Sequence, residues 1–205
     1  MAQRPDTPDR RERKKIASRI RIIEETMKAF KERGFHNITM EQIAELSDIS
    51  KATLYKYFPV KEAIIAAHWQ IEMINTADEF DQLLTTHSDT QSRLIALLNA
   101  FMTKIMEDRE LYLIYIKYRS QNVYDFESNA KLRSGAEKYL IQIFEAGQEN
   151  SEIRKDVPTI LLAGNFELVV IMQAMIWLRE PETFSLEASS NMLVDLFLNG
   201  ATSHE

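Results

Sequence analysis

The sequence has no cysteine and little glycine or proline, with five of each in 205 residues. The lack of cysteine excludes a disulfide framework, thiolate metal ligands and a cysteine nucleophile. Sandwiches and barrels need glycine and proline at their many turns, so the shortage of both disfavours those folds. The chain is instead rich in good helix formers, and we predict an all-α protein of about nine helices.

The charge is distributed unevenly along a chain of otherwise globular composition, with 45% hydrophobic and 27% charged residues. Residues 1–61 contain 14 Lys and Arg against 9 Asp and Glu, whereas residues 62–205 contain 11 against 22. A basic segment joined to an acidic body suggests a part that binds polyanions. A solvated basic tail would give the same charges, so the residue pattern of this segment has to distinguish a polyanion-binding part from a tail. No apolar run of the signal-peptide kind follows Met1, which predicts a cytoplasmic protein.

The amino-terminal quarter has the pattern of an arm and three helices. Residues 1–9 carry two prolines and no apolar periodicity, and we expect a disordered arm there. A first helix is predicted from residue 10 to Gly34. Its apolar stripe consists of Ile16, Ile20, Ile23, Met27 and Phe30.

Two short predicted helices follow, separated by a three-residue turn. Thr39 is placed to cap a helix over residues 40–46, with Gln42 in the capping-box position. Ser50 is placed to cap a helix over residues 51–58, which the following proline ends. Asp48 lies in the turn, where a residue that tolerates left-handed backbone is needed. The pattern is therefore a helix-turn-helix joined to a preceding helix.

A longer motif runs through this region. It consists of Thr39, Ile43-Ala44, Ser50, the run Thr53-Leu54-Tyr55-Lys56-Tyr57-Phe58, and Lys61-Glu62, with Ala29-Phe30 and Gly34 upstream. With this motif, residues 16–62 resemble the DNA-binding domain of the TetR (tetracycline-repressor-like) family of transcriptional regulators. The resemblance implies a DNA-binding domain over residues 10–62, with its motif at about residues 39–58. It also implies a helical ligand-binding and dimerisation domain over residues 63–205.

The resemblance implies that the second short helix enters the major groove of a double-stranded DNA operator. By this comparison, Thr39, Tyr55, Tyr57 and Lys61 hold phosphates. The residues placed near base edges are Lys51, Ala52, Thr53 and Lys56, and Gln42 touches bases or backbone. Two alternatives stay open: Tyr55 as a core aromatic of the small domain, and the basic run at residues 10–15 as plain solvated charge rather than a contact to flanking DNA.

The remainder of the chain reads as further helices with few breaks. One helix is expected from Lys61 to about Phe80 or Leu84, the next from a cap at Thr90 to about residue 107, and a short one over residues 108–118. Residues 121–125 read as irregular and residues 126–148 as helical. Asp156 is expected to cap the following helix, with Pro158 in its first turn, and Ser185 and Gly200 to bound the last.

Residues 157–178 are apolar nearly all round, which leaves three interpretations. A membrane span is disfavoured by Glu167 near the centre. A soluble helix of this kind must be covered on every side, so one side would meet a second copy of the chain. The predicted homodimer interface consists of Ile171, Met175, Leu178, Leu193, Leu196 and Phe197. The third interpretation is that the last two helices complete a monomeric core.

The resemblance also implies a small-molecule pocket among the later helices, for an apolar or amphipathic effector of unknown identity. Methionine and aromatic residues suit such a site, although each one taken singly is also ordinary core. The candidate ligand-binding residues are Trp69, Met73, Phe101, Tyr112, Tyr115, Phe166, Glu167 and Met172.

The predicted function is a sequence-specific DNA-binding regulator, a repressor released from a palindromic operator by its effector. No enzyme activity, cofactor or metal is expected, because the four histidines lack metal-ligand spacing and no phosphate-binding or nucleophile motif occurs. Two rival functions remain: a ligand-independent architectural protein on DNA, and a helical enzyme.

Overall fold

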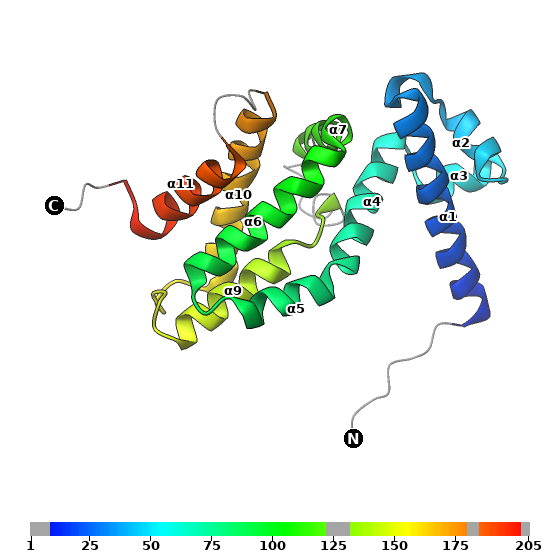
Figure 1. Cartoon of the computed structure of the whole chain (residues 1–205). Coiled ribbons are helices and arrows are strands. Elements are labelled where there is room, and N and C mark those ends of the chain that lie inside the picture. Colours follow the sequence, from blue (N-terminus) through cyan, green and yellow to red (C-terminus); the bar gives the residue numbers. More distant parts are fainter. Residues whose placement is uncertain (1–8, 122–131, 180–184, 202–205) are drawn as a thin grey trace. The chain divides into compact units, whose positions relative to one another are not determined.

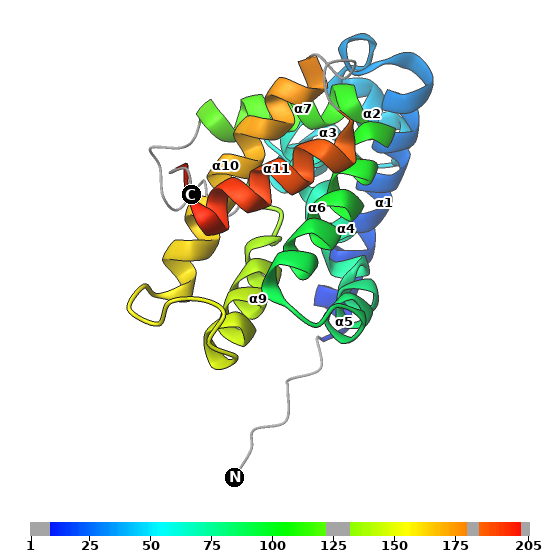
Figure 2. The same ribbon diagram turned by 60° about the vertical axis from the view of Figure 1, so that its left-hand side comes forward.

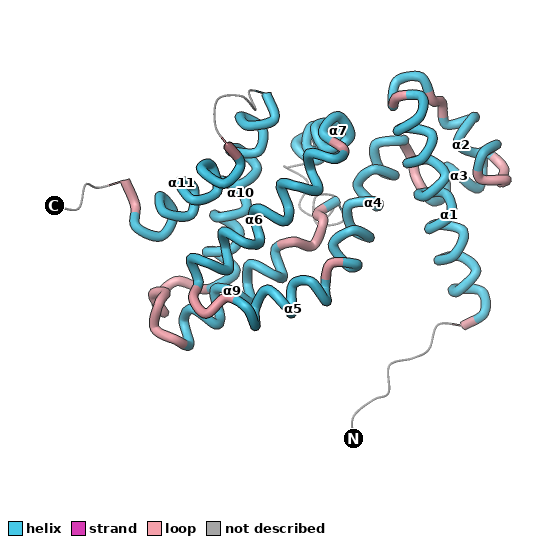
Figure 3. The backbone as a smooth tube through the Cα atoms, in the orientation of Figure 1, coloured by secondary structure: helices cyan, strands magenta, loops and turns pink. Residues whose placement is uncertain are grey.

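The structure of the chain is a computed structural model that describes residues 9–121, 132–179 and 185–201. These residues form ten α-helices and one short 3-10 helix and contain no strand (Figure 3), so the all-α prediction is confirmed. They divide into two compact units. Unit 1 comprises residues 1–70 and 114–132, and unit 2 comprises residues 71–113 and 133–205.

Unit 1 begins with the long helix α1 (Arg10–Arg33), shown in dark blue in Figure 1. The Asp9 side chain caps it by accepting from the backbone N–H groups of residues 11 and 12. Asp9 is thus part of the helix start rather than of the predicted arm, whose residues 1–8 lie outside the described residues. Gly34 ends α1 with φ 81°, a conformation that glycine adopts without steric cost.

Three shorter elements complete the predicted helix-turn-helix of unit 1. They are the 3-10 helix η1 (Phe35–Asn37), α2 (Met40–Leu46) and α3 (Lys51–Tyr57). Their bounds confirm the predicted helices, and Asp48 in the turn has φ 52° as expected. The core residues that these elements share with α1 include Ile22, Ile23, Met27, Phe30, Ile43, Leu54 and Phe58.

The first half of α1 is not covered by the rest of unit 1. Ile16 and Ile20, predicted in the buried stripe, are 45% and 39% exposed, which corrects that prediction. Helix α1 has 24 residues whereas α2 and α3 have seven each. At about 1.5 Å rise per residue, helices that short cover only part of the length of α1.

The predicted single helix after Pro59 is two helices, α4 (Lys61–Asn75) and α5 (Ala77–Thr86). The break lies at Thr76, whose hydroxyl donates to the carbonyl oxygen of Met73 at 3.0 Å. A threonine side chain that bonds the preceding turn competes with the helical ladder. The spacing of apolar residues does not indicate where a side-chain hydroxyl competes with the backbone hydrogen bonds of a helix.

Unit 2 is built from α5, α6 (Thr90–Glu107), α9 (Glu137–Glu149), α10 (Thr159–Arg179) and α11 (Leu186–Asn199). Figure 2 shows α10 and α11 crossing side by side, and α11 also packs on α6. The rings of Phe144, Phe166 and Phe197 meet at the centre, with centroids 4.9–6.1 Å apart. Helix α7 (Arg109–Gln121) and helix α4 each contribute residues to both units.

Several predicted boundaries in unit 2 are corrected. Asp89, not Thr90, caps α6 by accepting from the backbone N–H of Ser92 at 2.8 Å. Helix α9 begins at residue 137 instead of 126, because Gly135 has φ 92°, and residues 126–131 lie outside the described residues. Asp156 does not cap α10, since its carboxylate binds the guanidinium of Arg154.

Other predicted boundaries hold or cannot be compared. Ser185 caps α11 and Gly200 ends it, as predicted. Of the segment expected to be irregular, residue 121 belongs to α7 and residues 122–125 lie outside the described residues.

Helix α10 is long and apolar enough to cross a membrane by length and composition alone. Core helices of soluble proteins pass the same test, and α10 packs on α9 and α11. Glu167 and Phe166 lie on its buried side, together with Val170, Ala174 and Trp177. The opposite side is apolar and exposed, so both the buried and the unburied sides of this helix are hydrophobic.

Candidate functional site

The corner formed by α2 and α3 is fixed by side-chain caps. The Thr39 hydroxyl accepts from the backbone N–H of Gln42 at 3.3 Å, and the Gln42 Oε1 accepts from the backbone N–H of Thr39 at 2.9 Å. The Ser50 hydroxyl accepts from the backbone N–H of Thr53 at 3.1 Å. Both predicted caps are confirmed, and they set where each helix begins.

Most of the residues predicted to touch base edges are exposed on α3. Lys51, Ala52 and Lys56 are exposed, whereas Thr53 is half-buried with its hydroxyl 2.8 Å from that of Ser50. Tyr55 is 48% exposed, so its alternative interpretation as a core aromatic is wrong. Tyr57 is half-buried. The surface that α3 presents therefore carries cations and hydroxyl groups.

Lys61, predicted as a phosphate ligand, contacts backbone carbonyl groups of its own unit in this structure. Its Nζ donates to the carbonyl oxygens of Phe35 at 2.7 Å and Ile38 at 2.9 Å. The same nitrogen lies 4.1 Å from the centroid of the Phe35 ring. Burial lowers the pKa of Lys61 below its usual value. In this conformation the amine ties η1 to the start of α4.

A partner of Lys51 was missed by the sequence analysis. The Glu41 carboxylate on α2 lies 3.1 Å from the Lys51 Nζ, and both side chains are exposed, 45% and 62% respectively. The pKa of Glu41 is lowered by a hydrogen bond from its own backbone N–H and by Lys51. Glu41 and Lys51 are ten positions apart on separate helices, so no helical spacing indicates that they meet.

The exposed first half of α1 is strongly basic. Its residues 10–15 contain five Arg and Lys and one Glu, and all six are exposed. Further along, the Arg21 guanidinium donates to the carbonyl oxygen of Ser47 at 2.5 Å, and Arg19 lies over the Phe58 ring. These contacts hold α1 against the turn and the end of α3.

The eight candidate ligand-binding residues are distributed over the two units. Trp69 and Tyr115 belong to unit 1, where their rings lie 6.4 Å apart. The other six belong to unit 2, where Phe101 packs edge-on against Tyr112 at 6.2 Å. Met73 uses its carbonyl oxygen to accept from the Tyr139 hydroxyl at 2.6 Å. Most of the set forms core contacts, the alternative weighed above.

Glu167, a candidate ligand-binding residue on α10, forms an ion pair with Arg133, which the sequence did not predict. Its Oε2 lies 2.5 Å from the Arg133 Nη2, and Arg133 also pairs with Glu137. The ion pair explains how an acidic side chain is tolerated on the buried side of an apolar helix. Met172 is 59% exposed on the other side of α10, so its placement inside a pocket is corrected.

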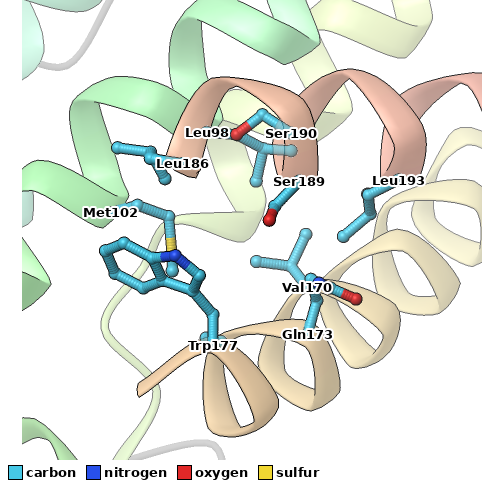
Figure 4. A pocket seen from close by; sticks show the side chains of 10 residues that line it. Leu98, Met102, Val170, Gln173, Trp177, Leu186, Ser189, Ser190 and Leu193 are labelled. Carbon is cyan, nitrogen blue, oxygen red and sulfur yellow. The ribbon is translucent and has the colours of Figure 1, made fainter. Parts of the chain in front are cut away.

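A small cavity lies between α6, α10 and α11 (Figure 4). Its volume is about 10 Å³, close to the space that one water molecule needs. The Ser189 hydroxyl points into it and has no hydrogen-bond partner among the described residues. The walls consist of Leu98, Met102, Val170, Gln173, Ala174, Trp177, Leu186, Ser189, Ser190 and Leu193.

The predicted dimer interface is only partly exposed. Leu178 and Leu193 are buried, and Phe197 packs on Phe144 and Phe166. These three residues fill the core, which corrects their assignment to an interface. Ile171 is half-buried, while Met175 and Leu196 are exposed. We define the outer apolar face as Ile160, Leu161, Leu168, Val169, Met172, Met175 and Ile176 of α10 with Met192 and Leu196 of α11.

No group of three or more His, Asp or Glu side chains with metal-binding geometry occurs within residues 9–121, 132–179 and 185–201. His68 and Glu72, spaced for one helix face, gain no third ligand there.

A capped helix-turn-helix with a cationic second helix, followed by a separate helical unit, defines a helix-turn-helix DNA-binding protein. Residues 22–68 match the family described as bacterial regulatory proteins, tetR family. Over 61 residues the chain is 41% identical to the HTH-type transcriptional regulator RutR of Escherichia coli K12, covering 30% of this chain and 29% of RutR. The helix-turn-helix region of the chain, residues 22–68, therefore matches the TetR family of transcriptional regulators.

The likeness extends over the second unit at lower identity. The fatty acid metabolism regulator protein of Bacillus subtilis is 19% identical over 182 residues, which cover 88% of this chain and 94% of that protein. The crystal structure of Thermus thermophilus FadR in complex with lauroyl-CoA has a TM-score of 0.80 at 21% identity, covering 91% and 96% of the two chains. The whole fold is therefore shared, beyond the helix-turn-helix.

Proposed function

We propose that this TetR-family regulator is a repressor released from its operator by an amphipathic ligand of the long-chain acyl thioester class. The observation that carries the proposal is the cavity in the apolar interior of unit 2, walled by the pliable Met102 and by Trp177 and Leu186. A relative of the same fold is described in complex with lauroyl-CoA. An apolar interior with few polar groups suits the acyl part of such a ligand.

The size of the cavity supplies the physical basis for release. About 10 Å³ is too small for an acyl chain, so binding requires α6, α10 and α11 to move apart. A ligand shifts an equilibrium only when it binds one arrangement better than another. An acyl ligand would thus favour an opened unit 2, and a typical coupling would weaken operator binding by roughly 5- to 150-fold.

We further propose that the regulator acts as a cytoplasmic homodimer joined through the outer apolar face. Leu168 and Met172 are 65% and 59% exposed on α10, and so large an apolar face is typical of a protein interface. A two-fold dimer presents two helix-turn-helix corners to half-sites about 34 Å apart on one palindrome. Leu168→Asp is expected to yield monomers in light scattering. Dimers that persist unchanged in this variant would contradict the proposed interface.

The test of release uses duplex DNA selected by the full chain from a random library. Fluorescence anisotropy then measures operator affinity with lauroyl-CoA or with free CoA. We expect lauroyl-CoA to raise the dissociation constant at least fivefold and free CoA to leave it unchanged. No response to lauroyl-CoA, or an equal response to free CoA, would overturn the proposed ligand class.

A matched pair of variants locates the response in the cavity. Ser189→Leu places a bulky apolar side chain in the cavity and removes an unpartnered hydroxyl, so it should reduce the response to lauroyl-CoA while operator binding persists. Ala188→Leu adds the same side chain at an exposed position of the same helix and should respond like the wild type. Equal responses from both variants would place the ligand elsewhere.

A ligand-independent DNA-binding regulator is the second candidate function. The small volume of the cavity favours it, since a sensor built to hold a ligand often has a larger preformed site. The same titration distinguishes the two functions, because a ligand-independent protein binds its operator equally in the presence and absence of lauroyl-CoA.

A further inference from the structure

An exposed ion pair of the helix-turn-helix joins its two helices at the end where α3 begins. Glu41 is the second residue of α2 and Lys51 is the first residue of α3. Their charged atoms lie 3.1 Å apart. Since residues at the amino-terminal end of the second helix contact base edges in this motif, Glu41 reaches the same place as Lys51.

Both members of the pair stand on backbone fixed by caps. The Thr39 capping box sets the first turn of α2, and the Ser50 cap sets the first turn of α3. The backbone that carries the donor and the acceptor is therefore held in place before DNA arrives. Such preorganisation lowers the entropy lost on binding.

A carboxylate at this place is difficult to reconcile with phosphate binding alone. Phosphates repel Glu41, and an exposed ion pair contributes little to stability. A lysine is only a donor and a carboxylate only an acceptor. Together they can satisfy a base edge that shows an acceptor next to a donor.

A G·C base pair shows this pattern in the major groove. Guanine offers the O6 acceptor, and cytosine offers the N4 donor. These two atoms share a Watson–Crick hydrogen bond, so they are about 2.7–3.2 Å apart. That spacing matches the 3.1 Å between the charged atoms of Glu41 and Lys51.

We propose that Glu41 and Lys51 together read one G·C base pair of the operator, with Lys51 donating to guanine O6 and Glu41 accepting from cytosine N4. Glu41 is then a specificity-determining residue rather than a passive counterion. The inference rests on the DNA-binding function of the chain and is independent of any effector.

The test is selection of duplexes from a random library by the full-length wild type, Glu41→Ala and Lys51→Ala. Both variants should lose preference at the same G·C pair by roughly 5- to 150-fold. Glu41→Gln should shift that position towards A·T, because a carboxamide pairs with adenine N6 and N7. Circular dichroism verifies that each variant remains folded.

Glu45→Ala is the matched control, since Glu45 is an exposed acid on the same helix. It should retain the wild-type preference at every position. The proposal is overturned if Glu41→Ala binds all sequences more tightly with unchanged preference, or if the two variants relax different base pairs. A wild type that enriches no sequence at all overturns the DNA-binding function itself, which is a different result.

Discussion

The two units of this chain are stabilised in different ways. In unit 1 the short helices α2 and α3 have seven residues each and depend on side-chain caps and on a lysine that bonds two carbonyl groups. In unit 2 the helices are mostly longer and meet through apolar and aromatic side chains, with Phe144, Phe166 and Phe197 at the centre. Polar groups thus fix where the short helices of unit 1 begin on its apolar core, and aromatic packing joins the longer helices of unit 2.

The largest expected effect comes from the core of unit 2. Phe166→Ala should lower the free energy of unfolding of unit 2 by about 3–5 kcal/mol, because it leaves a cavity among three rings. Urea denaturation followed by circular dichroism measures it. Asn165→Ala, at an exposed position of the same helix outside the outer apolar face, should cost far less, and equal costs would contradict the assignment of buried and exposed sides.

In unit 1 the variant that corresponds to Phe166→Ala is Leu54→Ala, which leaves a cavity at a fully buried position of α3. Its expected cost is about 2–5 kcal/mol in unit 1. Operator binding should be lost while binding of lauroyl-CoA persists. If Leu54→Ala abolished ligand binding as well, the two units would not be separable in function.

Lys61 provides the next test, because its observed carbonyl contacts and its predicted phosphate contact have different measurable effects. As a donor to two carbonyl groups it should stabilise unit 1, so Lys61→Met should cost about 1.5–3 kcal/mol. The slope of operator affinity against salt should stay as in the wild type. A phosphate contact would instead reduce that slope by about one and leave stability unchanged.

A pair of glycines tests the packing of unit 2. A Cβ on Gly147 would clash with the Thr90 hydroxyl oxygen and lie 2.7 Å from the Ile153 side chain. Gly147→Ala should therefore cost about 1–3 kcal/mol. Gly164→Ala on α10 meets no atom within 4 Å and should stabilise by up to about 1 kcal/mol through helix propensity. Thermal unfolding of both variants, with opposite shifts expected, checks the prediction.

The smallest expected effect concerns the cap of α6 and its dependence on pH. Hydrogen bonds from Ser92, from its backbone N–H above all, lower the pKa of Asp89 in the folded state. Ionised Asp89 therefore stabilises the fold above the usual pKa of about 3.9, and this stability is lost as the pH falls through its lowered pKa. Asp89→Asn keeps a capping side chain without the charge.

The difference in free energy of unfolding between the wild type and Asp89→Asn should be about 0.3–1 kcal/mol at neutral pH and disappear in acid. Urea titrations at several pH values measure it. A difference that is constant with pH would show that the charge of Asp89 does not contribute to stability.

The elements predicted well are those with local causes. Thr39, Ser50 and Ser185 each cap a helix a few residues along the chain, so their effect is visible in the sequence. The elements predicted wrongly depend on side-chain contacts or on backbone conformations that the spacing of apolar residues does not indicate. Thr76 breaks a helix through its own hydroxyl, and Gly135 delays the start of α9.

The candidate site divides in the same way. Tyr55 and the cations of α3 were predicted from the motif, and their exposure agrees with a surface role. The partners Glu41 and Arg133 were not found, because each meets its counterpart only after distant segments pack. Both sides of α10 are apolar, so periodicity could not tell core residues such as Leu178 from exposed ones such as Met172.

By itself, the sequence determined that the chain is helical, where the short helices of unit 1 begin, and that a basic corner precedes an acidic body. Those features follow from interactions between neighbours along the chain. Tertiary structure alone decided that Lys61 turns inward, that Glu41 meets Lys51, and which side of α10 is covered. Side chains far apart in sequence come within hydrogen-bond distance only once the helices have packed, and no local pattern records that packing.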